Sequence, residues 1–114
     1  MPFDRSFKFH DTDLQQRLVA AMRRAGVAHS VNAGDGAVCF SSEDERAFDD
    51  AAVEVRDFVY GEGSWHVCQC EPDEVCKYIE YMRRHGIRYV QETDDREPWF
   101  LLDRQHDPEK WGIW

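Results

Sequence analysis

Basic residues are scarce in this chain. Its 114 residues include 14 lysines and arginines against 23 aspartates and glutamates, which gives a formal net charge of −9 at pH 7. Binding to a nucleic-acid backbone depends on cations that neutralise phosphates, so we expect no nucleic-acid partner. The same acidity favours fast association with a basic protein surface. The alternative is an acidic charge that serves only solubility.

Long hydrophobic runs are also missing. No run approaches the ~20 apolar residues that span a bilayer, and the first residues lack the apolar core of a signal peptide. The sequence therefore predicts a cytoplasmic protein with no membrane partner. In that compartment we expect the four cysteines to stay reduced, namely Cys39, Cys68, Cys70 and Cys76.

No motif for a cofactor or a metal is present. Neither glycine pair, at 34 and 36 or at 61 and 63, continues into a phosphate loop or a dinucleotide fingerprint. His66, Cys68 and Cys70 would share one face of a strand, but alternate residues lie ~6–7 Å apart there. That spacing is too wide for two thiolates to bind one zinc ion at ~2.3 Å easily. We expect no cofactor and no metal site.

A repeated sequence is the most informative feature that is present. Met22–Val27 reads MRRAGV and returns sixty residues later as MRRHGI at Met82–Ile87. Each copy ends a helical pattern and precedes two strand patterns. In the first helix, Thr12 and Gln15 match a capping box. We predict a single domain, residues 1–114, with an internal repeat over about 5–42 and 64–104 and a linking helix over about 43–60.

The predicted fold class is α+β, with two βαββ repeats joined by a helix. The first six elements follow the ferredoxin-like split-βαβ order, which indicates an antiparallel sheet with helices on one face. Trp65 and Trp99 are expected on the open face, as an apolar patch covered by a second copy in a homodimer. Alternatively, the C-terminal tail covers it. Trp111 and Trp114 either pack on the domain or anchor a partner.

The linking helix carries an acidic strip. Residues 43–57 hold seven carboxylates and two arginines, a net charge of −5. Such a strip is either a solvated face or a docking surface for a basic partner. The predicted partner-binding residues are Glu43, Asp44, Asp49, Asp50, Glu54 and Asp57.

These patterns favour a small acidic protein-binding module. The most concrete version is an inhibitor or immunity-like protein that covers a basic surface of a partner such as a nuclease toxin. A small-molecule-binding regulatory domain of ferredoxin-like type is the alternative. A small enzyme that uses His10 or His66 with a nearby carboxylate comes third. We expect no enzymatic activity, since Asp11 beside His10 is explained more simply as a helix cap.

Overall fold

A computed structural model describes residues 3–112, which form six strands in one antiparallel sheet and three α-helices. This confirms the predicted α+β architecture. The elements are β1 (Arg5–Phe9), α1 (Thr12–Arg24), β2 (His29–Val31), β3 (Val38–Phe40), α2 (Glu45–Tyr60), β4 (Trp65–Gln69), α3 (Val75–Arg84), β5 (Tyr89–Asp94) and β6 (Glu97–Asp103). Short 3-10 turns lie at Ser42–Asp44, Pro72–Glu74 and Pro108–Lys110.

The strand order of the sheet is β2-β3-β1-β5-β6-β4. The first three strands have the order β2-β3-β1, and their sequence counterparts in the second half have the same order, β5-β6-β4. A ferredoxin-like arrangement would pair β4 with β1, but β5 occupies that place and β4 lies at the far edge. The ferredoxin-like part of the prediction is therefore not confirmed.

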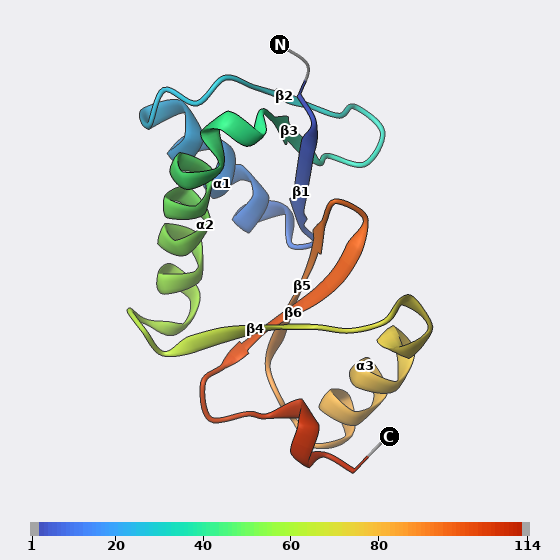
Figure 1. Cartoon of the computed structure of the whole chain (residues 1–114). Coiled ribbons are helices and arrows are strands. Elements are labelled where there is room, and N and C mark those ends of the chain that lie inside the picture. Colours follow the sequence, from blue (N-terminus) through green and yellow to red (C-terminus); the bar gives the residue numbers. More distant parts are fainter. Residues whose placement is uncertain (1–2, 113–114) are drawn as a thin grey trace.

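Helices α1 and α2 pack side by side on one face of the sheet (Figure 1). Leu18 and Met22 of α1 and Phe48 of α2 lie against the apolar side chains of β1 and β3. The Phe48 ring stacks on Phe40 at 4.2 Å between centroids, and it tilts against Phe7 at 5.2 Å. Burial of each such ring stabilises the fold by roughly 1.5–3 kcal/mol. This cluster fixes α2, and hence its acidic side, on the sheet.

Helix α3 covers the opposite face, so the prediction that all helices lie on one face is wrong. Its Tyr78 and Met82 pack with Phe100 and Leu102 of β6, whereas the intervening Leu101 belongs to the cluster under α1 and α2. Alternate residues of a strand point to opposite faces. The crossovers from β1 to β2 through α1 and from β4 to β5 through α3 both move two places across the sheet, in the same direction. However, β4 runs antiparallel to β1. Crossovers of one hand then require helices on opposite faces.

The tryptophans do not form the open patch that the sequence predicted. Trp65 packs against the cluster under α1 and α2, and its indole Nε1 donates a hydrogen bond to Asp57 Oδ1 of α2 at 2.7 Å. By strand alternation, the half-buried Trp99 belongs to the same face. A homodimer stays a prediction, but its proposed seam at Trp65 is wrong because α2 covers that side chain.

The C-terminal tail packs on α3. The ring of Trp111 stacks on Tyr81 at 4.5 Å and meets Tyr78 edge-on at 5.9 Å between centroids. The first of the two alternatives for Trp111, packing on its own domain, is therefore confirmed. Trp114 lies outside the described residues. Within residues 3–112, no helix combines the length and the apolar character needed to cross a membrane.

The start of α1 differs from the predicted capping box. Asp11, not Thr12, is the cap, and its Oδ1 accepts a hydrogen bond from the Leu14 amide at 3.1 Å. The Gln15 side chain turns into the core instead. Its Oε1 accepts from the Phe9 amide at 2.8 Å, and its Nε2 donates to the Gly36 carbonyl at 2.9 Å. Gln15 therefore ties α1 both to β1 and to the loop between β2 and β3.

Candidate functional site

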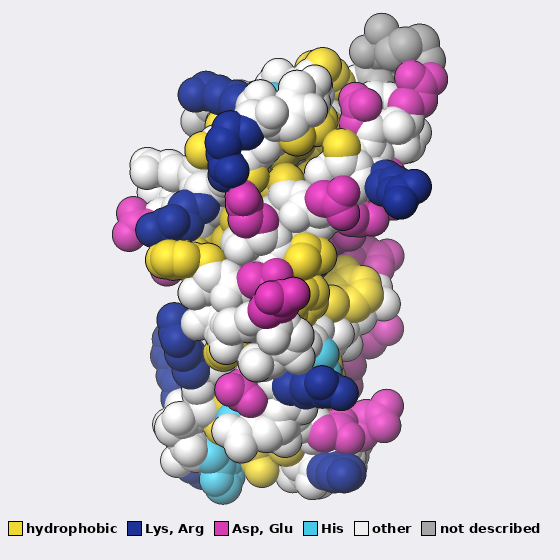
Figure 2. Space-filling model, turned by 90° about the vertical axis from the view of Figure 1, so that its left-hand side faces the viewer, with side chains coloured by type: hydrophobic (Ala, Val, Ile, Leu, Met, Phe, Trp, Pro, Cys, Tyr) yellow, Lys and Arg dark blue, Asp and Glu magenta, His cyan; other side chains and the backbone are white. Residues whose placement is uncertain are grey.

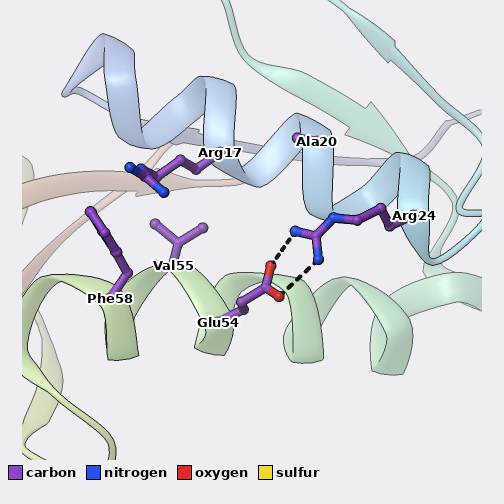
Figure 3. Close-up of a pocket in the computed structure, with 6 residues that line it drawn as sticks. All are labelled: Arg17, Ala20, Arg24, Glu54, Val55 and Phe58. Carbon is purple, nitrogen blue, oxygen red and sulfur yellow. Dashed lines mark hydrogen bonds and ion pairs between the residues drawn. The ribbon is translucent and has the colours of Figure 1, made fainter.

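The acidic strip of the sequence lies along α2 and the turn before it, but two of its predicted docking residues are held by the fold. Arg24 of α1 forms two hydrogen bonds with the Glu54 carboxylate, at 2.7 and 3.1 Å (Figure 3). Asp57 accepts the hydrogen bond from Trp65. Glu54 is thus neutralised by the chain's own arginine, while Asp57 has a neutral hydrogen-bond donor as its partner.

The remaining predicted docking carboxylates have no cation partner. Within the described part of the chain, Glu43, Asp44 and Asp50 make no side-chain hydrogen bond or ion pair. Burial and the neighbouring Glu45 carboxylate raise the pKa of Asp49, against the opposing effect of Arg5 and Arg56. These four carboxylates lie in the first half of α2 and the turn before it, but not on one face: Asp49 lies near Glu45 and Arg56, and Asp50 lies on the side that faces Arg24 of α1.

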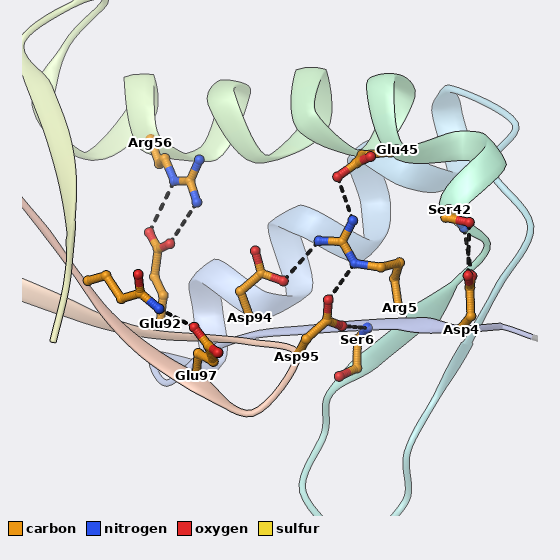
Figure 4. A network of polar contacts seen from close by, with 11 residues as sticks. Asp4, Arg5, Ser6, Ser42, Glu45, Arg56, Glu92, Asp94, Asp95 and Glu97 are labelled. Atoms are coloured by element: carbon orange, nitrogen blue, oxygen red, sulfur yellow. Dashed lines mark hydrogen bonds and ion pairs between the residues drawn. The ribbon is translucent and has the colours of Figure 1, made fainter. Parts of the chain in front are cut away.

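Two arginines close to these carboxylates, Arg5 and Arg56, are engaged on the inner side of α2 (Figure 4), whereas Arg46 of α2 is exposed and forms no ion pair within the described residues. Arg5 of β1 forms ion pairs with Glu45 of α2 and with Asp94 and Asp95, which end β5 and begin the next turn. These contacts join segments up to ninety residues apart. Arg5 therefore links β1, α2 and the β5–β6 hairpin, and it is not free to neutralise the outer carboxylates.

Arg56 also forms an ion pair, and its partner carboxylate is more deeply buried than those of Arg5. Its guanidinium donates two hydrogen bonds to Glu92 of β5, at 2.6 and 3.1 Å, and the Glu92 side chain is only 1% exposed. Burial raises the pKa of Glu92, while the hydrogen bonds from Arg56 lower it. The sequence analysis missed both Arg5 and Arg56 as structural residues, because their partners are distant along the chain.

An exposed aromatic side chain lies near the end of α2, beyond the outer carboxylates along the helix. Phe58 of α2 is 59% exposed, and the Arg17 guanidinium of α1 sits over its ring at 3.6 Å from the centroid. Together with Ala20 and Val55 they line a hollow of about 340 Å³ between the two helices, bounded by the Arg24–Glu54 pair (Figure 3). Helical spacing puts Phe58 on the same side as the buried Phe48 and Val55, yet the structure leaves it exposed.

Acidic and apolar side chains are both exposed on this side of the molecule. Figure 2 shows Asp and Glu side chains more often toward the right-hand edge of the view, with basic and apolar side chains among them. The exposed apolar residues of α2 are Val53 and Phe58. An aromatic anchor beside a charged rim is the usual composition of a protein interface.

Within residues 3–112, neither candidate histidine contacts a carboxylate. His10 Nε2 lies 2.7 Å from Thr93 Oγ1, and burial together with Lys8 lowers the pKa of His10. His66 Nε2 lies against the backbone carbonyl of His106, and its Nδ1 is 3.6 Å from Cys68 Sγ. Burial, with the carboxylates of Asp107 and Glu109, raises the pKa of the Cys68 thiol to about 11, which makes it a poor nucleophile at neutral pH.

Among the residues that the structure describes, no group of three or more His, Cys, Asp or Glu side chains is placed to hold a metal ion. Cys68 and Cys70 both pack in the cluster under α3, as expected for cysteines that act as core residues.

A second hollow, of about 360 Å³, lies on the part of the sheet that α3 leaves uncovered. Ser6 and Lys8 of β1, Cys39 of β3 and Thr93 of β5 form its floor, and Arg96 from the β5–β6 turn lies at its rim. These side chains are polar, in contrast to the tryptophan patch that the sequence predicted for the open face.

Comparison with known proteins gives no further guide to function. No protein-family model, no curated protein sequence and no solved structure matches this chain.

Proposed function

We propose that this chain is a small acidic protein-binding module of the inhibitor or immunity type, which covers a basic surface of a partner such as a nuclease toxin. The observation that carries the proposal is the outer side of α2 and its preceding turn. There, Glu43, Asp44, Asp49 and Asp50 form no ion pair within the described residues, and Phe58 is exposed further along the same helix.

The physical argument is that three arginines near α2 are already paired within the fold, so that, among the arginines of α2 in the described chain, only Arg46 remains to offset the outer carboxylates. Arg5, Arg24 and Arg56 each pair with a carboxylate that fixes an element of the fold. The outer carboxylates repel one another in the free protein, and a basic partner relieves that repulsion. Charge of this kind mainly raises the association rate, whereas a buried aromatic such as Phe58 would supply much of the affinity.

The proposal predicts a salt-sensitive association that depends on the outer carboxylates. The probe is the toxin domain of whichever toxin gene is found beside the gene for this chain, titrated calorimetrically at several salt concentrations. Changing Glu43 to Gln, and Asp44 and Asp50 to Asn, should weaken binding by roughly tenfold at low salt, since exposed charge pairs contribute about 0.2–1 kcal/mol each. These side chains have no partner within the described chain, so the fold should be unaffected.

A matched control removes the same charge elsewhere. Asp13→Asn, Glu62→Gln and Asp73→Asn also change three exposed carboxylates without a side-chain partner among the described residues. Their combined change should alter the affinity much less than the change on α2. Equal effects of the two triple variants would show that only net charge matters, and the docking surface on α2 would then be abandoned.

A small-molecule-binding regulatory domain is the second candidate, because the polar hollow on the open sheet face offers a site for it. The genes beside the coding sequence separate the two: a toxin gene supports inhibition, and a metabolic operon supports regulation. We also propose that the chain acts in the cytoplasm, because all four cysteines are free thiols.

We further propose that the two halves arose as a duplicated βαββ unit. The common strand order of the halves and the repeated MRRAGV and MRRHGI segments support this. Both segments end their helices in the same way: Gly26 and Gly86 have positive φ angles of 73° and 65°. The next residues, Val27 and Ile87, donate backbone hydrogen bonds to Met22 and Met82.

A further inference from the structure

One face of the sheet is left uncovered by the described helices over its first half, β1 to β3. α1 and α2 cover one face, and α3 covers the opposite face only over β4, β5 and β6. On that opposite face, Ser6 and Lys8 of β1 alternate with the buried Phe7 and Phe9. Cys39 of β3 lies beside Ser6 in the antiparallel register, and Thr93 of β5 lies beside Lys8. This uncovered part of the sheet is the floor of the 360 Å³ hollow.

The hollow gathers positive charge on an otherwise acidic molecule. Lys8 and Arg96 line it, and neither forms an ion pair with a carboxylate in the described part of the chain. Asp35 is the one carboxylate among the residues that line the hollow, and its Oδ1 already accepts a hydrogen bond from the Ala37 amide at 2.9 Å. The Ser6 hydroxyl and the Thr93–His10 pair add further polar groups to the lining.

The backbone at Arg96 supplies an independent argument. Asp95 and Arg96 are the central residues of the β5–β6 turn and have positive φ angles of 49° and 72°. Such turns favour Asn or Gly, because a side chain strains the backbone there. Asp95 is held in place by Arg5 and by the Ser6 amide, which donates to Asp95 Oδ1 at 2.8 Å. Arg96 makes no such contact within the described chain, so nothing inside the fold offsets its strain.

We propose that the hollow on the open sheet face binds a phosphate dianion, either inorganic phosphate or the phosphate group of a small monoester. Two unpaired cations match its double negative charge. The planar guanidinium of Arg96 suits bidentate contact with two phosphate oxygens, and the Lys8 ammonium acts as a point charge. The Ser6 hydroxyl donates a further hydrogen bond. A volume of about 360 Å³ lies within the range of small-molecule sites.

The test measures backbone amide shifts by two-dimensional NMR while inorganic phosphate, and then phenyl phosphate, is added at constant ionic strength. We expect saturable shifts centred on Ser6, Lys8, Cys39 and Thr93. Arg96→Gly should weaken binding about tenfold, as expected for the loss of charge-assisted hydrogen bonds. The same substitution relieves the positive-φ strain, so the thermal midpoint should rise by about 4 °C. Loss of binding in a more stable protein cannot be attributed to misfolding.

Lys8→Met is the second variant, and Lys77→Met is its control, because Lys77 is an exposed lysine of α3 remote from the hollow. Only Lys8→Met should weaken phosphate binding. Shifts that never saturate, or equal losses from the two lysine variants, would overturn the proposal. Succinate is the third ligand: if it bound as tightly as phosphate, the assignment to a phosphate dianion would be wrong. None of these outcomes depends on docking through α2.

Discussion

Replacing Arg56 with methionine should destabilise the protein by about 3–5 kcal/mol, which is the usual cost of leaving one partner of a buried ion pair alone. The Glu92 side chain is only 1% exposed, and the two hydrogen bonds from Arg56 offset the cost of burying its carboxylate. The Arg56 guanidinium also lies over Trp65 at 5.4 Å from the ring centroid. The substitution would therefore loosen β4 as well as leave a buried carboxylate.

Urea unfolding measures the loss of stability, and two further variants serve as its control and as a test of rescue. Arg46→Met removes an arginine from the exposed side of the same helix, where no side-chain partner exists among the described residues, and should change stability by less than about 0.5 kcal/mol. Arg56→Met combined with Glu92→Leu should recover most of the lost stability, because no buried charge remains. If Arg56→Met were no more harmful than Arg46→Met, the ion pair would not be important for stability.

The pH dependence of the Arg56→Met variant provides a separate check. Burial already raises the pKa of Glu92, and loss of the opposing hydrogen bonds from Arg56 would raise it further. A carboxyl group whose pKa is higher in the folded than in the unfolded protein disfavours folding once it is ionised. The free energy of unfolding therefore falls as the pH rises above the pKa of glutamate in the unfolded chain, about 4.3. The deficit relative to the parent protein should therefore be smaller at pH 4 than at pH 7.

Most elements of the fold could be predicted, because their signals are local. Apolar residues at helical spacing predicted α1, α2 and α3, and alternation predicted both hairpins. The face on which α3 packs could not be predicted in this way. It depends on β5 pairing with β1, which reverses the direction of β4 relative to β1. No single segment of the sequence carries that information.

The candidate site shows the same division. The acidic character of residues 43–57 is visible in the sequence, but its pairing is not. Arg24 neutralises Glu54 from thirty residues away, and Arg5 reaches Glu45 from forty residues away. The strain at Arg96 was also hidden: the residues from Thr93 to Glu97 read as a polar turn, and only the two-residue connection of the hairpin imposes positive φ angles.

Gln15 is the residue whose sequence signal was most misleading, and its substitution by methionine should cost about 3 kcal/mol. As part of a capping box it would be exposed and worth little. Instead it is 8% exposed, and its amide bonds to the Phe9 amide, the Gly36 carbonyl and, at 3.3 Å, the Phe7 carbonyl. Methionine has a similar volume, so the loss would come from leaving these buried backbone groups without a partner, at about 1–3 kcal/mol each.

Gln16→Met is the matched control, because the neighbouring glutamine is exposed on the outer side of α1. It should leave the urea midpoint nearly unchanged. Hydrogen exchange adds a local measurement: the Phe9 amide should lose protection in Gln15→Met and keep it in Gln16→Met. Equal stability of the two variants would mean that water satisfies the exposed backbone groups. The link from α1 to β1 and to the β2–β3 loop, which borders the phosphate hollow, would then be weaker than its three hydrogen bonds indicate.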